Sequence, residues 1–422
     1  MNVPIPPPAQ AAGPGVAGAP GMAPDLDRVR ATLMVLGIAL HAADVFITAG
    51  DWLVADPHRS VVFDALVALI HSFRVPGFFL LSGLFFAGSL GRHGAPELLM
   101  RQLLRLGLPL LTCWALLNGA QQALLAWHRG GDPWEAVFST PAPIYHLWFL
   151  RDLLILDLLV LAWIAIAGRG ARASGASGAS GAPGRLTRVS ARAWAWAWLS
   201  TRLGSHGPSH WLTVALCGAL LSHALLIAIR LTGWAYVKGL GGLTLYNLAF
   251  YAPLFLAGMA MAHRPAWLDA WLRTPAWLLP MAAFAASWGD GASDTLTGAL
   301  AREAALAVQL LGIWIATGAA VGGLGRLRRG GPRSVMGRAL SDASYTIFLV
   351  HHLLVVALAL ALLPRDWPAS VKFCLIVVGT LALSLAFHRW VVRPFAAMRL
   401  LFNGRGPAPS ASHDTAAAPG RA

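Results

Sequence analysis

Residues 26–46 read LDRVRATLMVLGIALHAADVF, with Arg30 near the start of an apolar stretch and His41 eleven positions further on. In a helix that rises about 1.5 Å per residue, the His41 imidazole lies roughly 16 Å beyond Arg30. That distance places His41 near the middle of a bilayer whose hydrocarbon core is about 30 Å thick. Ionisable side chains are costly at this depth, and they typically mark functional sites. The stretch therefore predicts a membrane-spanning helix that carries a functional histidine.

The composition of the whole chain also indicates a membrane protein. Hydrophobic residues make up 57% of the sequence and charged residues 12%, whereas a soluble domain carries about 25% charged residues. The net charge of +14 does not indicate nucleic-acid binding, because the basic residues lie in short loops between apolar runs. Cys113, Cys217 and Cys374 lie in three separate apolar runs. Their spacing suggests neither a metal site nor a disulfide framework.

The apolar runs predict an all-α fold, a polytopic bundle of about ten transmembrane helices. We place these helices near residues 30–49, 61–89, 103–127, 145–167, 211–231, 245–262, 276–289, 297–321, 341–363 and 370–392. The seventh is short and contains Pro280. The second exceeds what a bilayer needs, which predicts a tilt or an extension beyond the lipid.

The distribution of basic residues predicts the orientation of the bundle. Alternate loops at 92–105, 169–202, 264–273 and 326–338 contain most of the arginines. The intervening loops contain Arg59, Arg129, Lys238 and Arg365. Cytoplasmic loops are enriched in Lys and Arg. We therefore predict an even number of spans with both termini in the cytoplasm.

Three further segments are expected to lie outside the packed helices. Residues 1–24 are rich in Pro, Ala and Gly without the basic start of a signal peptide, and we interpret them as a disordered tail. Residues 403–422 are interpreted in the same way. The Gly-, Ala- and Ser-rich stretch at 168–210 is expected to form a flexible cytoplasmic loop inside a transmembrane domain of residues 25–395.

Four of the predicted helices carry polar groups into the apolar region. They are His41 on the first helix, His71 and Arg74 on the second, His146, Trp148 and Arg151 on the fourth, and Tyr345 and His351 on the ninth. Each charge scattered among lipid tails would cost about 2.5–3.5 kcal/mol on insertion scales. Gathered around one hydrated cavity, the same groups would satisfy one another.

Several of these residues also allow purely structural interpretations. Arg74 could form a buried pair with Asp152 or Asp157, and His352 and His388 are expected to form helix–helix hydrogen bonds. Ser82-Gly83 could be a small-residue packing patch.

Arg101 and Arg105 stand one helical turn apart at the start of the third helix. They could be ordinary cytoplasmic anchors or a clamp for phosphate groups.

Four sequence elements, in order along the chain, resemble the acyltransferase 3 family of membrane proteins. They are Arg30 and His41 separated by ten residues; the run of residues 78–86 containing Ser82-Gly83; MRQLLRLGLPLL at 100–111; and SDASYTIFLVHH at 341–352. The resemblance covers roughly residues 25–395 without the 168–210 loop. Within the family, the segments look most similar to a subgroup that succinylates periplasmic glucans.

The resemblance implies transfer of a succinyl or acetyl group from acyl-CoA to a hydroxyl of an extracytoplasmic glucan or other polysaccharide. It also implies a multi-pass protein of a bacterial inner membrane, with acyl-CoA as donor substrate and no tightly bound cofactor. His41 would act as a general base or as a nucleophile.

The roles of the other residues follow the same resemblance. Arg30, His71 and Arg74 would join His41 in catalysis, and substrate binding is expected from Arg101, Arg105, Ser82, His146, Trp148, Arg151, Tyr345 and His351. Arg74 or Arg151 could pair with the free carboxylate of a succinyl group.

Two other functions remain open on the sequence alone. A proton-coupled transporter or flippase also needs ionisable residues within the membrane. A membrane sensor or scaffold would use the long cytoplasmic loop to bind a partner, but it has no need of clustered intramembrane charges.

Overall fold

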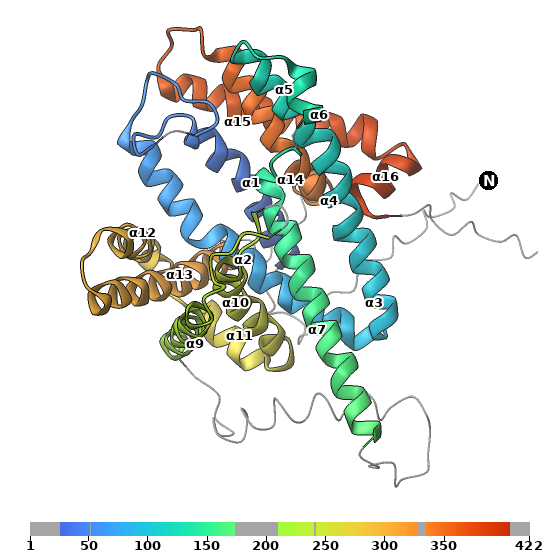
Figure 1. Ribbon diagram of the computed structural model, residues 1–422, viewed down its shortest axis with the longest axis vertical. Helices are drawn as coiled ribbons and strands as arrows, with labels where there is room; N and C mark the ends of the chain where they lie inside the picture. The colour runs from blue at the N-terminus through green and yellow to red at the C-terminus, as the bar shows by residue number, and fades with distance from the viewer. Residues whose placement is uncertain are drawn as a thin grey trace, which may run out of the picture.

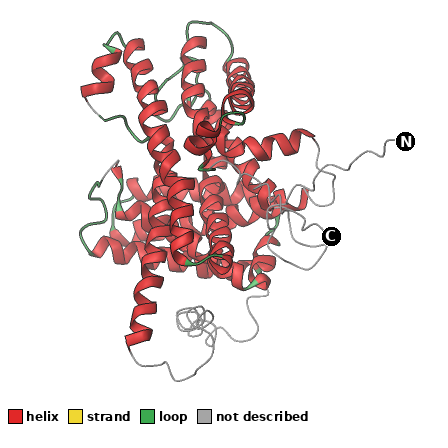
Figure 2. Cartoon of the chain, turned by 90° about the vertical axis from the view of Figure 1, so that its right-hand side faces the viewer, coloured by secondary structure: helices red, strands yellow, loops and turns green. Residues whose placement is uncertain are grey.

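The structure is a computed structural model that describes residues 26–50, 52–139, 141–173, 210–239, 242–327 and 335–405. Within these ranges the chain is helical, with no β-strand (Figure 2). The all-α prediction is therefore confirmed for the described residues. Residues 174–209 of the predicted loop and nearly all of both predicted tails lie outside the described residues.

The N-terminal half of the chain supplies most of the helices around the candidate site described below. In chain order they are α1 (Leu26–Asp44), α2 (Val61–Arg92), α3 (Ala95–Gln102), η1 (Leu103–Gly107), α4 (Leu108–Cys113), η2 (Trp114–Asn118), α5 (Gly119–His128), α6 (Pro133–Ser139), η3 (Tyr145–Leu147) and α7 (Trp148–Ala173). The elements from α3 to α5 form one continuous rod in which η1 and η2 are π-helical turns. Because α7 continues to Ala173, residues 168–173 are helical and not part of a loop.

The C-terminal half adds the remaining helices. They are α9 (Trp211–Leu231), α10 (Leu245–His263), α11 (Pro265–Leu272), η6 (Ala276–Leu278), α12 (Leu279–Thr295), α13 (Ala299–Leu327), α14 (Val335–Leu362), α15 (Ala369–Phe387), η7 (His388–Val392) and α16 (Ala396–Asn403). Asn403 thus ends a helix that the sequence analysis did not predict.

A helix lies at each of the ten predicted segments. Seven helical segments in the described residues are long and apolar enough to cross a membrane: Val61–Arg92, Ala95–His128, Trp211–Leu231, Leu245–His263, Ala299–Leu327, Gly337–Leu362 and Ala369–Val392. α1, α7 and α12 do not belong to this set. These helices indicate a multi-pass membrane protein, whereas the count of ten spans and the location of both termini stay predictions.

The bundle has two distinct ends, which Figure 1 separates vertically. The loop after α1, the turn between α5 and α6 and the turn between α14 and α15 lie at the upper end, and α7 reaches Ala173 at the lower end. We call these the upper and lower ends below.

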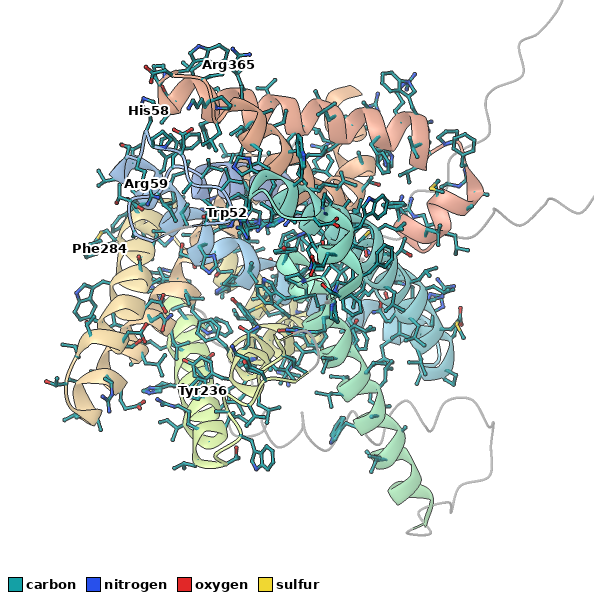
Figure 3. The ribbon with its side chains drawn as sticks, turned by 45° about the horizontal axis from the view of Figure 1, so that its top comes forward. Trp52, His58, Arg59, Tyr236, Phe284 and Arg365 are labelled. Atoms are coloured by element: carbon teal, nitrogen blue, oxygen red, sulfur yellow. The ribbon has the colours of Figure 1, made fainter. Side chains whose placement is uncertain are left out.

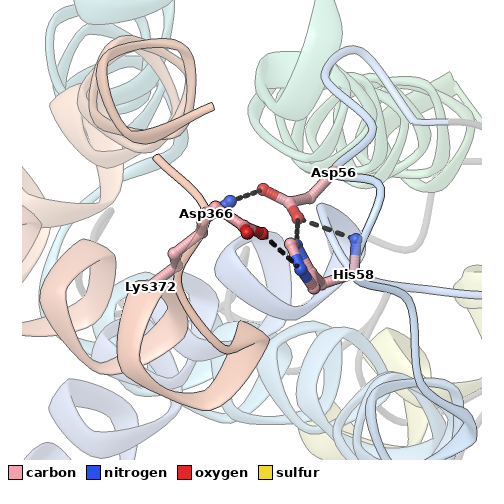
Figure 4. Close-up of polar contacts among 4 residues, drawn as sticks. All are labelled: Asp56, His58, Asp366 and Lys372. Atoms are coloured by element: carbon pink, nitrogen blue, oxygen red, sulfur yellow. Dashed lines mark hydrogen bonds and ion pairs between the residues drawn. The ribbon is translucent and has the colours of Figure 1, made fainter. Parts of the chain in front are cut away.

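A buried ion pair holds two connections together at the upper end. Lys372 Nζ of α15 donates to Asp56 Oδ2 in the loop after α1 at 2.7 Å, and both side chains are at most 2% exposed (Figure 4). Removing one partner of such a pair costs about 3–5 kcal/mol, because the other charge is left buried. The pair therefore fixes the loop of residues 45–60 against α15.

Candidate functional site

A cavity of about 330 Å³ lies among α1, α2, α14 and the start of α7, and we call it the upper cavity. Its polar lining consists of His41, Asp44, His71, Arg74 and His146. Apolar and aromatic side chains, among them Trp148, Phe149 and Phe348, complete its walls. Five of the residues predicted from sequence to act on the substrate, namely His41, His71, Arg74, His146 and Trp148, therefore face one space.

His41 is paired with a carboxylate that follows it on the same helix. Residues three apart lie on one face of a helix, and His41 Nδ1 lies 3.0 Å from Asp44 Oδ2. The two side chains are 15% and 13% exposed. Because Nδ1 faces the carboxylate, Nε2 is the ring nitrogen left to act on a substrate.

The predicted end of the first helix needs a correction. The sequence analysis extended the first helix to residue 49, but α1 ends at Asp44, so His41 stands in its last turn. The histidine is still enclosed, because the loop of residues 45–60 and α14 cover this end of α1. The indole of Trp52, from that loop, has its centroid 5.9 Å from the His41 ring.

Three further histidines surround His41. The ring centroid of His41 lies 5.4 Å from that of His351 and 4.8 Å from that of His352, and His146 lies 4.7 Å from His352. His146 Nε2 and His351 Nδ1 face the carbonyl oxygens of Leu349 and Phe348. His146 Nδ1 and His351 Nε2 are buried without a hydrogen-bond partner. Among the described residues, no three His, Cys, Asp or Glu side chains are grouped to hold a metal ion.

Arg74 brings a buried positive charge next to this cluster. Its Nε donates to the Leu33 carbonyl oxygen at 3.1 Å, and the residue is 5% exposed. A Cβ built on Gly37 would overlap Arg74 Nη2 and lie 3.1 Å from His351 Nε2. The guanidinium thus occupies the space that a glycine leaves on α1, beside the unpartnered His351 nitrogen.

A second and smaller space, the lower cavity, lies toward the lower end. It measures about 70 Å³, and its lining includes Arg30, Ser82, Arg105, Asp157 and Tyr345. Arg30 pairs with Asp27 at 3.4 Å and lies over the Phe85 ring at 5.2 Å, while its Nε is buried without a partner. The Tyr345 hydroxyl donates to the Arg105 carbonyl oxygen at 2.7 Å.

Two phenylalanines separate the cavities. Phe78 and Phe149 line both of them, and their ring centroids are 5.3 Å apart. Arg30 and His41 therefore belong to two adjoining spaces along α1, with an aromatic pair at the boundary.

Three predicted binding residues, Arg101, Arg151 and His351, line neither cavity. Arg101 is exposed and bonds Glu97 Oε1 at 2.9 Å on its own helix. Arg151 pairs with the buried Asp152 at 2.8 Å. Arg101 and Arg105 are therefore not brought together into one clamp.

The structure also decides between several of the structural interpretations. Among the described residues Arg74 has no carboxylate within ion-pair distance, so the expected pair with Asp152 or Asp157 is absent. His352 Nδ1 bonds Gln121 Oε1 at 2.7 Å and His388 Nδ1 bonds Thr346 Oγ1 at 2.9 Å. The prediction of helix–helix hydrogen bonds is confirmed for both histidines.

The sequence analysis missed Asp44 as a member of the site. The signal was present, because His41 and Asp44 have the spacing of a helical pair. It was hidden by the expectation that the helix continued beyond Asp44. Trp52 was also missed, because a tryptophan near the end of an apolar segment is ordinarily an interfacial anchor.

Comparisons with known proteins identify relatives of the chain. A family model described as an acyltransferase domain, acyltransferase 3, matches residues 24–389. Glucans biosynthesis protein C from Escherichia coli strains K12 and SMS-3-5 is 32% identical over 142 residues, which cover 32% of this chain and 37% of each relative. The match thus spans little more than a third of those relatives. No solved structure matches the chain.

Proposed function

The chain belongs to the acyltransferase 3 family, whose model matches most of its length, and from that membership we propose that it is a membrane-embedded O-acyltransferase. It would transfer an acyl group from acyl-CoA to a hydroxyl of a polysaccharide on the far side of a bacterial inner membrane. The observation that carries the proposal is the His41–Asp44 pair in the upper cavity, beside Arg74.

Donor binding is assigned to the lower cavity. CoA carries phosphates, and Arg30 and Arg105 supply positive charge there. With Arg30 at the start of α1 and His41 roughly 16 Å further along the helix, the pantetheine arm would pass between Phe78 and Phe149 to bring the thioester into the upper cavity.

His41 then acts as the general base. The Asp44 carboxylate accepts a hydrogen bond from Nδ1–H and fixes the tautomer, so that Nε2 removes the proton of the acceptor hydroxyl. The hydroxyl oxygen attacks the thioester carbonyl, and the tetrahedral intermediate carries a negative charge on oxygen. When it collapses, the C–S bond breaks and the CoA thiolate takes the proton from His41.

Arg74 is placed to stabilise negative charge in this reaction. Its guanidinium has no carboxylate partner among the described residues and lies beside the His41 cluster. It can donate to the oxyanion of the intermediate. If the acyl group is succinyl, the same residue could instead hold the free carboxylate, which favours succinyl over acetyl as the transferred group.

The test uses purified protein in liposomes with labelled succinyl-CoA or acetyl-CoA and a glucose oligosaccharide as acceptor. We expect an acylated oligosaccharide, identified by the mass of the added group. His41→Ala should lower kcat by about 10²–10⁴-fold, the usual contribution of a general base. Asp44→Asn should lower kcat with little change in either KM, because it disturbs the tautomer and not the binding.

His388→Gln is the matched control, because His388 bonds Thr346 away from both cavities. It should leave kcat unchanged. Full activity in a folded His41→Ala protein would exclude His41 as the base. Movement of the oligosaccharide across the bilayer without acylation would instead indicate a transporter.

A further inference from the structure

The loop of residues 45–60 places an indole ring against the candidate catalytic histidine. The Trp52 and His41 rings are nearly parallel, at 13°, with centroids 5.9 Å apart. That separation exceeds a direct face contact of about 3.5–4.0 Å, so the imidazole does not lie in close contact with the indole face. Trp52 is half-buried, and it lies near the middle of the upper end, whereas His58, Arg59 and Arg365 lie toward the margin (Figure 3).

The loop that carries Trp52 is fastened on both sides. Lys372 holds Asp56 from α15, and His58 lies 3.3 Å from Asp56 Oδ1 and 3.1 Å from Asp366 Oδ1 (Figure 4). Nearer α1, the Thr48 backbone N–H donates to Asp64 Oδ1 of α2 at 2.9 Å. The indole is therefore positioned by the packed bundle and does not hang from a free loop.

A second aromatic ring approaches the same histidines from another connection. Tyr145 stacks on His352 with centroids 5.6 Å apart, and Trp52 meets the same His352 ring edge-on at 5.4 Å. Tyr145 has a φ of +42°, a left-handed conformation that is costly for a residue other than glycine. Such strain persists only where the surroundings fix it, and it is common at functional sites.

We propose that Trp52 and Tyr145 form the acceptor subsite, and that the flat face of a pyranose ring packs on them while its hydroxyl edge reaches His41. The proposal rests on the proposed acyltransferase function. A pyranose presents C–H groups on its faces and hydroxyls around its rim. An aromatic face therefore binds the ring and leaves the hydroxyls free for a neighbouring base. A sugar ring on the indole would lie beside the imidazole, as the transfer requires.

The subsite also separates the two substrates in space. The positive charges assigned to CoA lie in the lower cavity, whereas Trp52 lies at the upper end (Figure 3) and Tyr145 packs on the same His352 that Trp52 contacts. The two substrates would thus meet at His41 from opposite sides of the bundle.

The experiment measures steady-state kinetics in liposomes with acyl-CoA and a glucose oligosaccharide, varying each in turn. Trp52→Leu should raise the KM for the oligosaccharide about 5- to 10-fold, the usual value of an aromatic contact, with the KM for acyl-CoA unchanged. Trp52→Phe should give a smaller rise because it keeps an aromatic face. Trp134→Leu is the matched control, since Trp134 lies on α6, is 72% exposed and stacks on Phe138, away from the histidine cluster.

Tyr145→Leu supplies a second variant outside the loop, and it should raise the same acceptor KM. An unchanged acceptor KM in both leucine variants, or an equal rise in the donor KM, would overturn the subsite while leaving the acyltransferase proposal intact. A wild-type protein that transfers no acyl group to any sugar would instead refute the proposed function itself.

Discussion

Gly37 is the residue on which the position of Arg74 depends. It lies on the face of α1 toward α2, one turn before His41, and the Arg74 guanidinium fills the space that a side chain would occupy. Arg74 in turn bonds the Leu33 carbonyl oxygen of α1. The Arg74 guanidinium can lie this close to the histidine cluster because residue 37 has no side-chain methyl group.

Gly37→Ala should lower kcat at least tenfold while leaving the fold intact. The new Cβ overlaps Arg74 Nη2, so the guanidinium has to move away from the reacting atoms, and misplacements of about 1 Å can cost on the order of 100-fold in rate. Kinetics in liposomes measure the effect. Gly91→Ala is the control, because a Cβ at Gly91 meets nothing within 4 Å. Equal activities of the two variants would show that Arg74 is not needed where it stands.

Some of the charged residues of the site could be identified from the sequence alone. Arg30, His41 and Arg74 were recognisable because ionisable side chains in an apolar run are costly and typically functional. All three line a cavity. Asp44 was not recognised, because the first helix was expected to continue beyond it to residue 49. Its role becomes visible only once the end of α1 is known.

At the scale of elements, α2 and α10 form the closest crossing near the site. A Cβ at Gly83 would overlap the Phe255 carbonyl oxygen, and one at Gly258 would overlap that of Leu80. The two helices thus touch through their backbones, as helices in membranes do where small residues face each other. The crossing holds the part of α2 that bears Phe78 and Ser82.

Gly83→Ala should destabilise the bundle by about 1–3 kcal/mol, the usual cost of overpacking. The obstacle is a backbone carbonyl, which cannot rotate away, so α2 and α10 have to separate. Thermal unfolding in detergent should therefore show a lower Tm. Gly91→Ala, on the same helix without neighbours, should leave the Tm unchanged or raise it, because alanine is the better helix former. A Tm for Gly83→Ala equal to that of the wild type would contradict the crossing.

The sequence predicted the helices better than their ends and their contacts. Apolar runs located a helix at each predicted segment, and Ser82-Gly83 was identified as a possible packing patch. The packing interpretation is confirmed for Gly83, which packs against α10. Ser82 lines the lower cavity, and its role in substrate binding stays a prediction. The end of α1 was wrong because hydrophobicity continues into residues 45–48, which fold back over the helix end.

At the scale of the whole molecule, one cavity lies toward the lower end of the bundle and the other toward the upper end. Arg105 lines the lower cavity, and Arg101 does not. The sequence analysis treated Arg101 and Arg105 as equivalent because they are four residues apart. The π-helical turn of residues 103–107 intervenes and changes the angular relation of residues on either side, which spacing alone does not reveal.

Arg105→Gln should raise the KM for acyl-CoA about tenfold or more, since hydrogen bonds to charged groups contribute roughly 1.5–3 kcal/mol. The KM for the sugar acceptor should stay the same. Arg101→Gln is the matched control, because Arg101 is exposed and paired with Glu97. Initial rates at varied acyl-CoA measure both variants. Equal rises for the two would favour general attraction of an anionic donor over a defined contact, and no rise for Arg105→Gln would remove it from the donor site.

The Asp56–Lys372 bridge has a consequence for biosynthesis. It joins residues 316 positions apart, one just after the first helix and the other in α15. Synthesis proceeds from the N-terminus, so Asp56 waits for its partner until α15 has been synthesised. A nascent chain that stops before α15 would hold every residue of both cavities, yet its Trp52 loop would lack the bond to α15 and keep the Thr48–Asp64 contact with α2. The protein would then become catalytically competent only after α15 has been synthesised and has packed against the loop.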